Sequence, residues 1–285
     1  AVQLSGDLPA AEKLIRDVIA DQTAALGKSH RDTLDSRSSL ADMLQDQGKY
    51  AAAIQVSGPL VADAAAALGD DDTLTLQARS IHASILGSMD REAEAEPVIR
   101  AVIASKKKIL GPDNPGTLVS EGVLADTLKN LGRLDEAVDL QRSIVERARR
   151  ELGPEHTATL TYTNNLAQTL RGQGKFDEAE PLYRQVLEAR RTQEGENSRE
   201  TLILKVNLGR LFYDQKKFDQ ALPFYKSALD GFQATMPDHW MTAATKAYIA
   251  ESLAGLKRFD EAETLMLQAY AEVTKSLAPD HNRAR

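Results

Sequence analysis

The residue types in this chain that could do chemistry are its histidines and its clustered carboxylates. Four of the five histidines occupy one position of a recurring segment: His30, His156, His239 and His281. Imidazole is a common ligand of zinc, but histidines that lie a full repeat apart are not expected to converge on one ion. A Pro-Asp/Glu-His turn that leads into a helix explains their shared position, so we predict no metal site.

The carboxylates cluster twice, at Asp70 to Asp72 and at Glu92, Glu94 and Glu96. These clusters lack the fixed ligand spacing of a calcium loop, and a solvated surface is the simpler interpretation. The chain has no cysteine, Gly-rich phosphate loop, zinc-protease helix motif or nucleophile elbow. We therefore predict no catalytic residues and no cofactor, and we do not expect an enzyme.

Composition limits the partners that the chain can have. The net charge is -7 over 285 residues, which argues against a nucleic-acid partner. No apolar run approaches the roughly 20 residues of a membrane span, and no signal peptide is visible. The absence of cysteine is compatible with a reducing compartment. We expect a cytoplasmic protein with no nucleic-acid or membrane partner.

A polar stripe near the middle of the chain is the best candidate for a binding surface. Asn164, Asn165, Gln168 and Arg171 share one side of a predicted helix, opposite its apolar stripe, so the core does not need them. Positions a repeat away hold Lys129, Asn207, Arg210, Tyr213 and Tyr248. An Asn amide donates and accepts hydrogen bonds at once, which suits an extended peptide backbone. Simple solvation of these polar positions is the alternative.

Basic runs recur near the ends of other predicted helices. They are Lys106-Lys107-Lys108, Arg147-Arg149-Arg150 and Arg190-Arg191. Cations at a helix C-terminus oppose the helix dipole favourably, which is the structural interpretation. A basic ridge for an acidic partner is the functional alternative.

A repeat must position all of these residues. The Thr159-Leu160 pair recurs as Thr33-Leu34, Thr75-Leu76, Thr117-Leu118 and Thr201-Leu202 at steps of 42 residues, and a sixth copy, Thr242-Ala243, follows after 41. A period of this length indicates stacked units, each of which buries its apolar face on the next. Two apolar stripes per unit, separated by a turn at Gly174, predict a helix A and a helix B. The fold class is therefore all-α, with about 13 antiparallel helices.

We predict a single array over residues 1–285 with no internal domain boundary. Its parts are a partial repeat with helix B only (1–26), the repeats 27–68, 69–110, 111–152, 153–194, 195–235 and 236–277, and the start of a further repeat or tail (278–285). Because both ends fall inside a repeat, we expect a slice of a longer protein.

Small residues mark where helices A and B approach most closely. The helix A position holds Ala41, Ala83, Ala125, Ala167, Gly209 and Ala250, and the helix B position holds Ala11, Ala53, Ala95, Ala137, Ala179, Ala221 and Ala262. A larger side chain there would overpack the contact. An aromatic residue opens helix B at Tyr50, Phe176, Phe218 and Phe259.

These features resemble the tetratricopeptide repeat. The Leu-Gly-Pro-Asp/Glu, Asn-Asn-Leu-Ala and Gln-Gly-Lys-Phe-Asp-Glu-Ala-Glu segments are similar to the 42-residue kinesin light chain subtype. The resemblance implies a right-handed α-solenoid whose helix A residues line a concave groove, with Asn side chains on a peptide backbone. It implies a non-catalytic scaffold that binds a protein or peptide partner. We expect such a segment to lie across Lys129 to Tyr248 and, given Lys129, Arg171 and Arg210, to be acidic or mixed in charge. A regulatory region of a larger kinase, nucleotide-binding or protease protein is the alternative.

The repeat 69–110 departs most from the pattern. Asp90 replaces the turn glycine, Glu92 replaces the aromatic residue, and His82 stands where other repeats have an aliphatic residue. We expect His82 and Glu92 to lie close together between helices A and B, as a hydrogen-bonded polar pair. The alternative is a pH-sensitive hinge, in which the carboxylate raises the pKa of His82.

Overall fold

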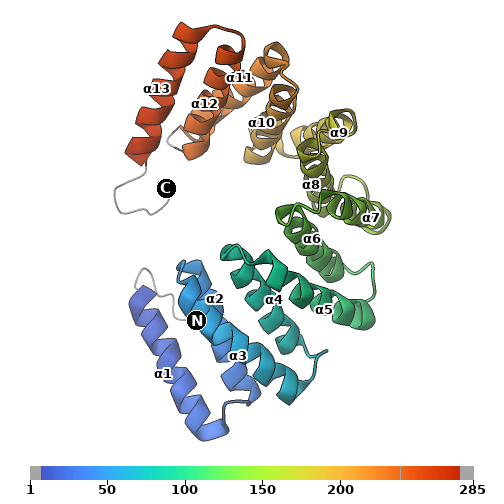
Figure 1. Ribbon diagram of the computed structural model, residues 1–285, viewed down its shortest axis with the longest axis vertical. Helices are drawn as coiled ribbons and strands as arrows, with labels where there is room; N and C mark the ends of the chain where they lie inside the picture. Colours follow the sequence, from blue (N-terminus) through green and yellow to red (C-terminus); the bar gives the residue numbers. More distant parts are fainter. Residues whose placement is uncertain (1–7, 238, 277–285) are drawn as a thin grey trace. The chain divides into compact units, whose positions relative to one another are not determined.

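The computed structural model describes residues 8–237 and 239–276, and in this part of the chain it contains thirteen helices and no strand (Figure 1). The helices are α1 (Leu8–Leu26), α2 (Arg31–Asp46), α3 (Tyr50–Leu68), α4 (Thr73–Ser88), α5 (Glu92–Leu110), α6 (Pro115–Asn130), α7 (Leu134–Leu152), α8 (Thr157–Gly172), α9 (Phe176–Glu194), α10 (Arg199–Asp214), α11 (Phe218–Thr235), α12 (Trp240–Gly255) and α13 (Phe259–Ser276). The predicted all-α class is confirmed.

Helix lengths reproduce the period of the sequence. Helix A is represented by α2, α4, α6, α8, α10 and α12, which have 16 residues each. Most B helices have 19 residues and end at a glycine with positive φ, such as Gly195 at 96°. By contrast, α11 has 18 residues and ends at Met236. The single 41-residue step therefore comes from a B helix that is one residue shorter than the others. Met236 occupies the position of its terminal glycine.

The turn between helices A and B needs a left-handed residue. Gly174 has φ 75°, and the following amide, Lys175 N, donates to Leu170 O at 2.9 Å and so closes the end of α8. Asp90 adopts φ 55° at the same position of the atypical repeat, a conformation that Asp tolerates better than most residues. The turn therefore keeps its left-handed conformation although Asp90 replaces the glycine.

The start of each A helix is capped by the side chain of the residue that precedes it. These N-cap residues are His30, Asp72, Asn114, His156, Ser198 and His239. The His156 Nδ1 atom, for example, accepts a hydrogen bond from Ala158 N at 3.2 Å, which satisfies an otherwise unpaired amide of the first turn. The predicted structural role is confirmed for His30, His156 and His239, while His281 lies outside the described residues.

The small residues lie in the core as the pattern predicts. Every member of the helix A set is buried, and so is every member of the helix B set except Ala11, which is half-buried in α1. Gly209 is the tightest position, because a Cβ atom there would lie 2.5 Å from the ring of Tyr225. Close approach of the two helices thus sets an upper limit on side-chain size.

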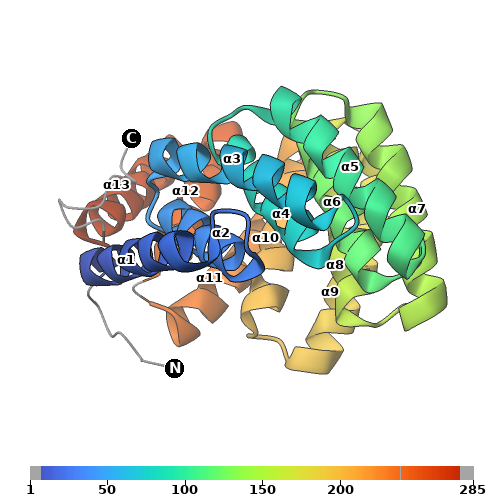
Figure 2. The same ribbon diagram turned by 90° about the horizontal axis from the view of Figure 1, so that it is seen from below.

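The helices group into two compact units, one up to Glu151 and the other from Leu152 onward. Within each unit, consecutive helices pack as antiparallel neighbours; Figures 1 and 2 both show α4 beside α5. In unit 1, residues from α4 to α7 such as Leu86, Ile99, Leu124 and Ala137 share one core cluster.

One helix corrects an expectation about apolar runs. Among the described residues, α3 is long and apolar enough to cross a membrane by length and composition, although we expected no such segment. In the structure α3 packs between α2 and α4 as helix B of its repeat. Its Asp63 forms ion pairs with Arg37 at 2.8 Å and with Lys28 at 3.0 Å. Much of the apolar character comes from alanines, of which Ala53 and Ala64 are buried and others, such as Ala66 and Ala67, are exposed.

The expected pairing of His82 with Glu92 is wrong. The His82 Nδ1 atom lies 2.9 Å from Ser57 Oγ, whereas Glu92 accepts a hydrogen bond from Asn130 Nδ2 at 3.2 Å. The first residue of helix B faces the end of the next helix A, as Phe218 does where it fills the space beside Gly255. Burial, reinforced by the Arg91 charge and opposed by Glu94, lowers the pKa of His82. The pH-sensitive hinge required a raised pKa for His82, and the structure instead gives a lowered one.

Two helix A glycines allow a matched test of the packing limit. Gly209→Ala should lower the free energy of unfolding by about 1–3 kcal/mol through overpacking against Tyr225. Gly172→Ala should be neutral or stabilising by up to about 1 kcal/mol, because a Cβ atom there meets nothing within 4 Å. Urea denaturation of both variants measures the difference. Equal stability of the two proteins would contradict the assigned contact.

Replacing His82 by leucine should make stability less dependent on pH. The folded protein holds the His82 proton less tightly than the unfolded chain does, because burial lowers the pKa. Stability is therefore fully present above the ordinary value of about 6.5 and falls as the pH drops toward the lowered folded value. Urea denaturation at pH 7.5 and pH 5.5 should show a smaller loss for His82→Leu than for the wild type. The same loss in both proteins would count against this assignment.

Candidate functional site

The predicted polar stripe forms a continuous face in unit 2. Asn207 on α10 donates from Nδ2 to Asn164 Oδ1 on α8 at 3.3 Å, so the two helices are joined through their amides. Asn207 is only 8% exposed, and its first role is to connect consecutive repeats. Asn165 and Gln168 are half-buried, and their amides have no hydrogen-bond partner among the described residues. These two amides are the ones left open to a ligand.

Arg171 lies in a polar cluster beside this face. Its Nε atom lies 3.2 Å from Asp214 Oδ2, without the alignment of a hydrogen bond, and both Nε and Nη1 are buried with no hydrogen-bond acceptor. The hydroxyl of Tyr183 is also buried and unpaired. Burial raises the pKa of Tyr183 to about 12, with the Arg171 and Arg210 charges opposing the shift. Tyr183 therefore remains a neutral hydroxyl near two guanidinium groups.

Aromatic rings form the other half of the face. The guanidinium carbon of Arg210 lies 5.6 Å from the ring centroid of Tyr248, within cation–π range. Tyr248 stacks on Tyr225 with centroids 5.6 Å apart. Tyr213 meets the ring of Phe218 edge-on at 5.3 Å. The rings of Tyr213 and Tyr248 are thus held in place, while Arg210 remains exposed.

Lys129 is the one predicted residue that belongs to unit 1. It lies on α6 in unit 1 and forms an ion pair with Asp126 at 2.8 Å. The stripe also omitted residues that the structure places against this face: Asp214, which is exposed, and Tyr183 and Tyr225, which are buried. The last two had a signal in the sequence, because they are tyrosines 42 residues apart on successive B helices. Asp214 had no such signal in the sequence, since the equivalent positions of the preceding repeats hold Gly172 and Asn130.

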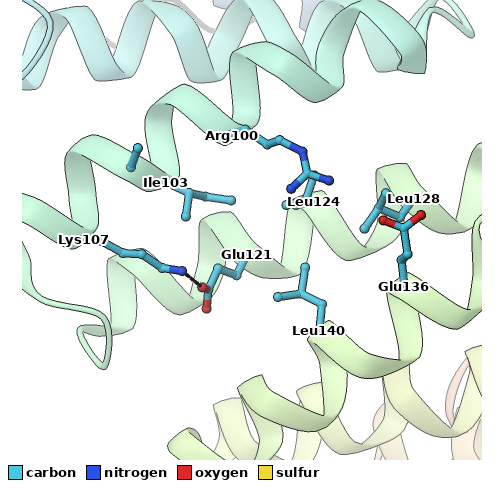
Figure 3. Close-up of a pocket in the computed structure, with 9 residues that line it drawn as sticks. Arg100, Ile103, Lys107, Glu121, Leu124, Leu128, Glu136 and Leu140 are labelled. Carbon is cyan, nitrogen blue, oxygen red and sulfur yellow. Dashed lines mark ion pairs between the residues drawn. The ribbon is translucent and has the colours of Figure 1, made fainter.

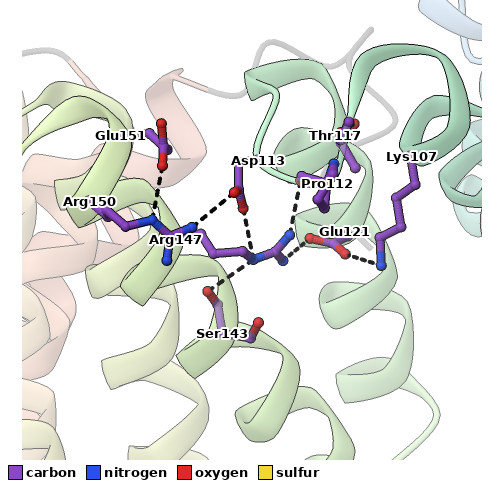
Figure 4. A network of polar contacts seen from close by, with 10 residues as sticks. Lys107, Pro112, Asp113, Thr117, Glu121, Ser143, Arg147, Arg150 and Glu151 are labelled. Carbon is purple, nitrogen blue, oxygen red and sulfur yellow. Dashed lines mark hydrogen bonds and ion pairs between the residues drawn. The ribbon is translucent and has the colours of Figure 1, made fainter.

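A second polar cluster surrounds Glu121 on α6 (Figure 4). This carboxylate is 2% exposed, pairs with Lys107 Nζ at 2.7 Å and is hydrogen-bonded by Arg147. Arg147 also donates to Pro112 O at 3.0 Å. A buried charge needs partners, and α5 and α7 supply one each. The network therefore joins two repeats of unit 1.

The Glu121–Arg147 pair recurs in other repeats with reversed charge. Helix A and helix B residues 26 positions apart form the pairs Arg37–Asp63 and Lys246–Glu272. In the repeat 153–194 the same positions hold Thr163 and Ala189, which carry no charge. This position is therefore a structural link within the repeat.

A cavity of about 360 Å³ opens beside this network, between α5, α6 and α7 (Figure 3). Its floor is apolar, with Ile103, Leu124, Leu128 and Leu140, and charged side chains stand around it. Those charges are already paired: Lys107 with Glu121, Arg100 with Glu96, and Arg133 with Glu136. The cavity offers apolar surface but no free charge to orient a ligand.

The acidic clusters singled out by the sequence are also paired with cations. Asp71 pairs with Lys108, Asp72 with Arg31, and Glu94 with Arg91, and these cations lower the pKa of each carboxyl. Within residues 8–237 and 239–276, no three His, Asp or Glu side chains are grouped to hold a metal ion. Asp71 and Asp72 are thus paired with cations of other helices, and Glu94 with the residue that precedes its own helix.

Family models identify the repeat. A model described as "Tetratricopeptide repeat" matches residues 120–192 and 176–234, and a second model of the same description matches residues 33–73 and 242–283. The matched segments together span more than half of the chain. No curated protein matches the chain by sequence.

Solved structures share the fold. Crystal structures of kinesin light chain TPR-like repeats from Podosopora anserina match with a TM-score of 0.65 at 23% identity, over 73% of this chain and 98% of that one. BtubC (BKLC) from P. vanneervenii gives 0.63 at 20% identity, over 84% and 94%. A tetratricopeptide repeat protein from Parabacteroides merdae gives 0.67 at 13% identity, over 98% and 89%. The predicted solenoid of kinesin light chain-like repeats is confirmed as a fold.

The buried charge pair can be tested by substitution. Glu121→Gln should lower the free energy of unfolding by about 1.5–3 kcal/mol, the range for a hydrogen bond to a charged group. Glu136→Gln, which removes an exposed partner of Arg133, should cost less than about 1 kcal/mol.

A double-mutant cycle supplies the control. Glu121→Thr with Arg147→Ala installs the residues of the next repeat, and its cost should be smaller than the two single costs added together. Strictly additive costs, measured by urea denaturation, would show that the two side chains do not depend on each other.

Proposed function

Because the chain belongs to the tetratricopeptide repeat family, we propose that it is a non-catalytic scaffold that binds an extended segment of a partner protein. Repeats of this family generally mediate interactions between proteins, and stacked repeats provide extended surfaces for them. The proposed site is the helix A face of unit 2. The observation that carries the proposal is the pair of unpaired amides on that face, Asn165 and Gln168.

The open amides suit a peptide backbone. Asn165 and Gln168 lie three residues apart on α8 and therefore share one face of the helix. Each amide can donate to a carbonyl and accept from an N–H group of an extended segment. Each such bond contributes about 1 kcal/mol net. Asn207 is instead assigned a supporting role, because it is bonded to Asn164.

Charges on this face favour a partner of mixed character. Arg210 is exposed and has no carboxylate partner among the described residues, so it can receive an Asp or Glu side chain. Arg171 is offset by Asp214 at 3.2 Å, and Glu251 is exposed on α12. An acidic residue of the partner is therefore proposed at Arg210, with a basic one allowed near Glu251.

Tyr213 and Tyr248 provide the apolar part of the surface. Stacking on Tyr225 and edge contact with Phe218 fix the two rings, so they lose little conformational entropy when a partner binds. Aromatic residues with fixed rings are common anchors at protein interfaces. The expected cytoplasmic location and the absence of nucleic-acid and membrane partners remain predictions.

A library of random linear peptides displayed on phage tests this proposal with the complete chain. Selected peptides should carry Asp or Glu and should bind the purified protein in a fluorescence-anisotropy titration. Arg210→Ala should weaken them by about 10- to 100-fold, the effect of a charge-assisted hydrogen bond of about 1.5–3 kcal/mol. Asn165→Ala with Gln168→Ala should weaken them by roughly 5- to 30-fold.

Arg184→Ala is the matched control, because Arg184 also lies over aromatic rings, Phe212 and Phe224, but belongs to helix B. It should leave peptide affinity unchanged. Peptides that bind Arg210→Ala and the double amide variant as tightly as the wild type would place the binding surface elsewhere.

A further inference from the structure

The three lysines at the end of α5 have three different environments. Lys107 pairs with Glu121 at 2.7 Å, and Lys108 pairs with Asp71. Lys106 is half-buried and has no carboxylate partner among the described residues; its Nζ atom donates to Ser120 Oγ at 2.8 Å and to Gly116 O at 3.2 Å. An ammonium group has three N–H donors. One donor of Lys106 is therefore still available.

Lys106 lines a cavity of about 230 Å³ between α4 and the end of α5. The other lining residues that matter here are Leu76, Gln77, Ser80, Ile109 and Leu110. The Ser80 hydroxyl donates to Leu76 O at 2.8 Å and is neutral, so it does not offset the charge of Lys106. Burial lowers the pKa of Lys106, and no nearby carboxylate opposes that shift. The cavity thus combines one cation with aliphatic walls.

Exposed apolar side chains occur on α5, where Ile109 and Leu110 line this cavity, and on the adjacent α6. Ile109, Leu110, Val119 and Val123 are between 47% and 54% exposed. The other exposed large apolar residues in the described part of the chain belong to α1, α3, α12 and α13 or to the turn after α12. Gly116, Val119, Ser120 and Val123 are spaced so that they share one face of α6, and Ser120 binds Lys106. The apolar patch and the lysine therefore belong to one surface of unit 1.

We propose that this cavity binds a small aliphatic carboxylate, with the carboxylate on Lys106 and the hydrocarbon chain over Leu76, Ile109 and Leu110. A single negative charge matches the single ammonium, whereas a phosphate dianion would leave an uncompensated charge beside apolar walls. The volume is smaller than the roughly 300–1,000 Å³ of pockets for drug-sized ligands, which favours a short unbranched chain. Gln77 is exposed at the rim, where its amide can donate to the second carboxylate oxygen.

This site is independent of the peptide face proposed for unit 2. None of its residues belongs to α8, α10 or α12. Either proposal can therefore fail without affecting the other.

Isothermal titration calorimetry of the complete chain with sodium octanoate tests the assignment. Octanoate should bind saturably, and Lys106→Met, which keeps an unbranched apolar stem, should weaken binding by at least about tenfold. Lys108→Met removes the same charge from an exposed pair and should change the affinity by less than about twofold. Each methylene added from butanoate to octanoate should strengthen binding about fourfold.

Two further measurements separate loss of binding from loss of folding. Ile109→Ser leaves the hydrogen bonds of Lys106 in place, and it should weaken octanoate while the circular dichroism spectrum and Tm stay unchanged. Octan-1-ol, the neutral analogue, should bind the wild type and Lys106→Met equally. Absence of saturable octanoate binding to the wild type would overturn the proposal, and so would equal octanoate affinity in the wild type and Lys106→Met.

Discussion

Close approach of helices A and B at their small residues is the contact on which the rest of the structure depends. Neither helix can bury its apolar stripe alone, and the two stripes meet only where alanine or glycine lets the backbones come together. Ala41 and Ala53 are both fully buried in this way. In one repeat the ring of Tyr225 approaches helix A at Gly209, where a Cβ atom would lie 2.5 Å from the ring. Helix length and repeat period follow from keeping this contact in register.

A second constraint acts on charge. Helix A and helix B residues 26 positions apart meet inside the repeat, and a charge at the helix A position needs a partner. In three repeats the helix B position supplies it, as Arg37–Asp63, as Glu121–Arg147 with the signs exchanged, and as Lys246–Glu272. In two others, where the helix B position is uncharged, the loop before helix A supplies it, as Arg79–Asp70 and Lys205–Glu196. The fold therefore requires a partner for this charge and leaves the residue types free to vary. Repeats with one backbone can for this reason differ widely in surface charge.

Features that depend on a single repeat could be predicted from the sequence, and features that depend on the neighbouring repeat could not. The period, the turn at Gly174, the histidine caps and the small-residue positions are local, so spacing alone reveals them. Glu92 was assigned to His82 because both lie in one repeat, but the first residue of helix B faces the following helix A, where Asn130 lies. Asn207 was expected to bind a ligand, yet it is joined to Asn164 of the preceding repeat. Side-chain partners across a repeat boundary require the three-dimensional stacking.

The ion pairs of this chain determine which of its cations can act on a ligand. Lys107 and Arg147 share the buried Glu121, so an anion offered to either must first displace a carboxylate that is already desolvated. In the described part of the chain, Lys106 has only neutral oxygen partners, and Arg210 has only the face of Tyr248. A cation partly removed from water without a counter-charge has an unfavourable solvation free energy. An anion that reaches the half-buried Lys106 offsets that term, whereas the exposed Arg210 can receive a carboxylate without displacing an ion-pair partner. For these reasons the two proposals assign the partner's negative charge to these residues and not to the more conspicuous basic runs.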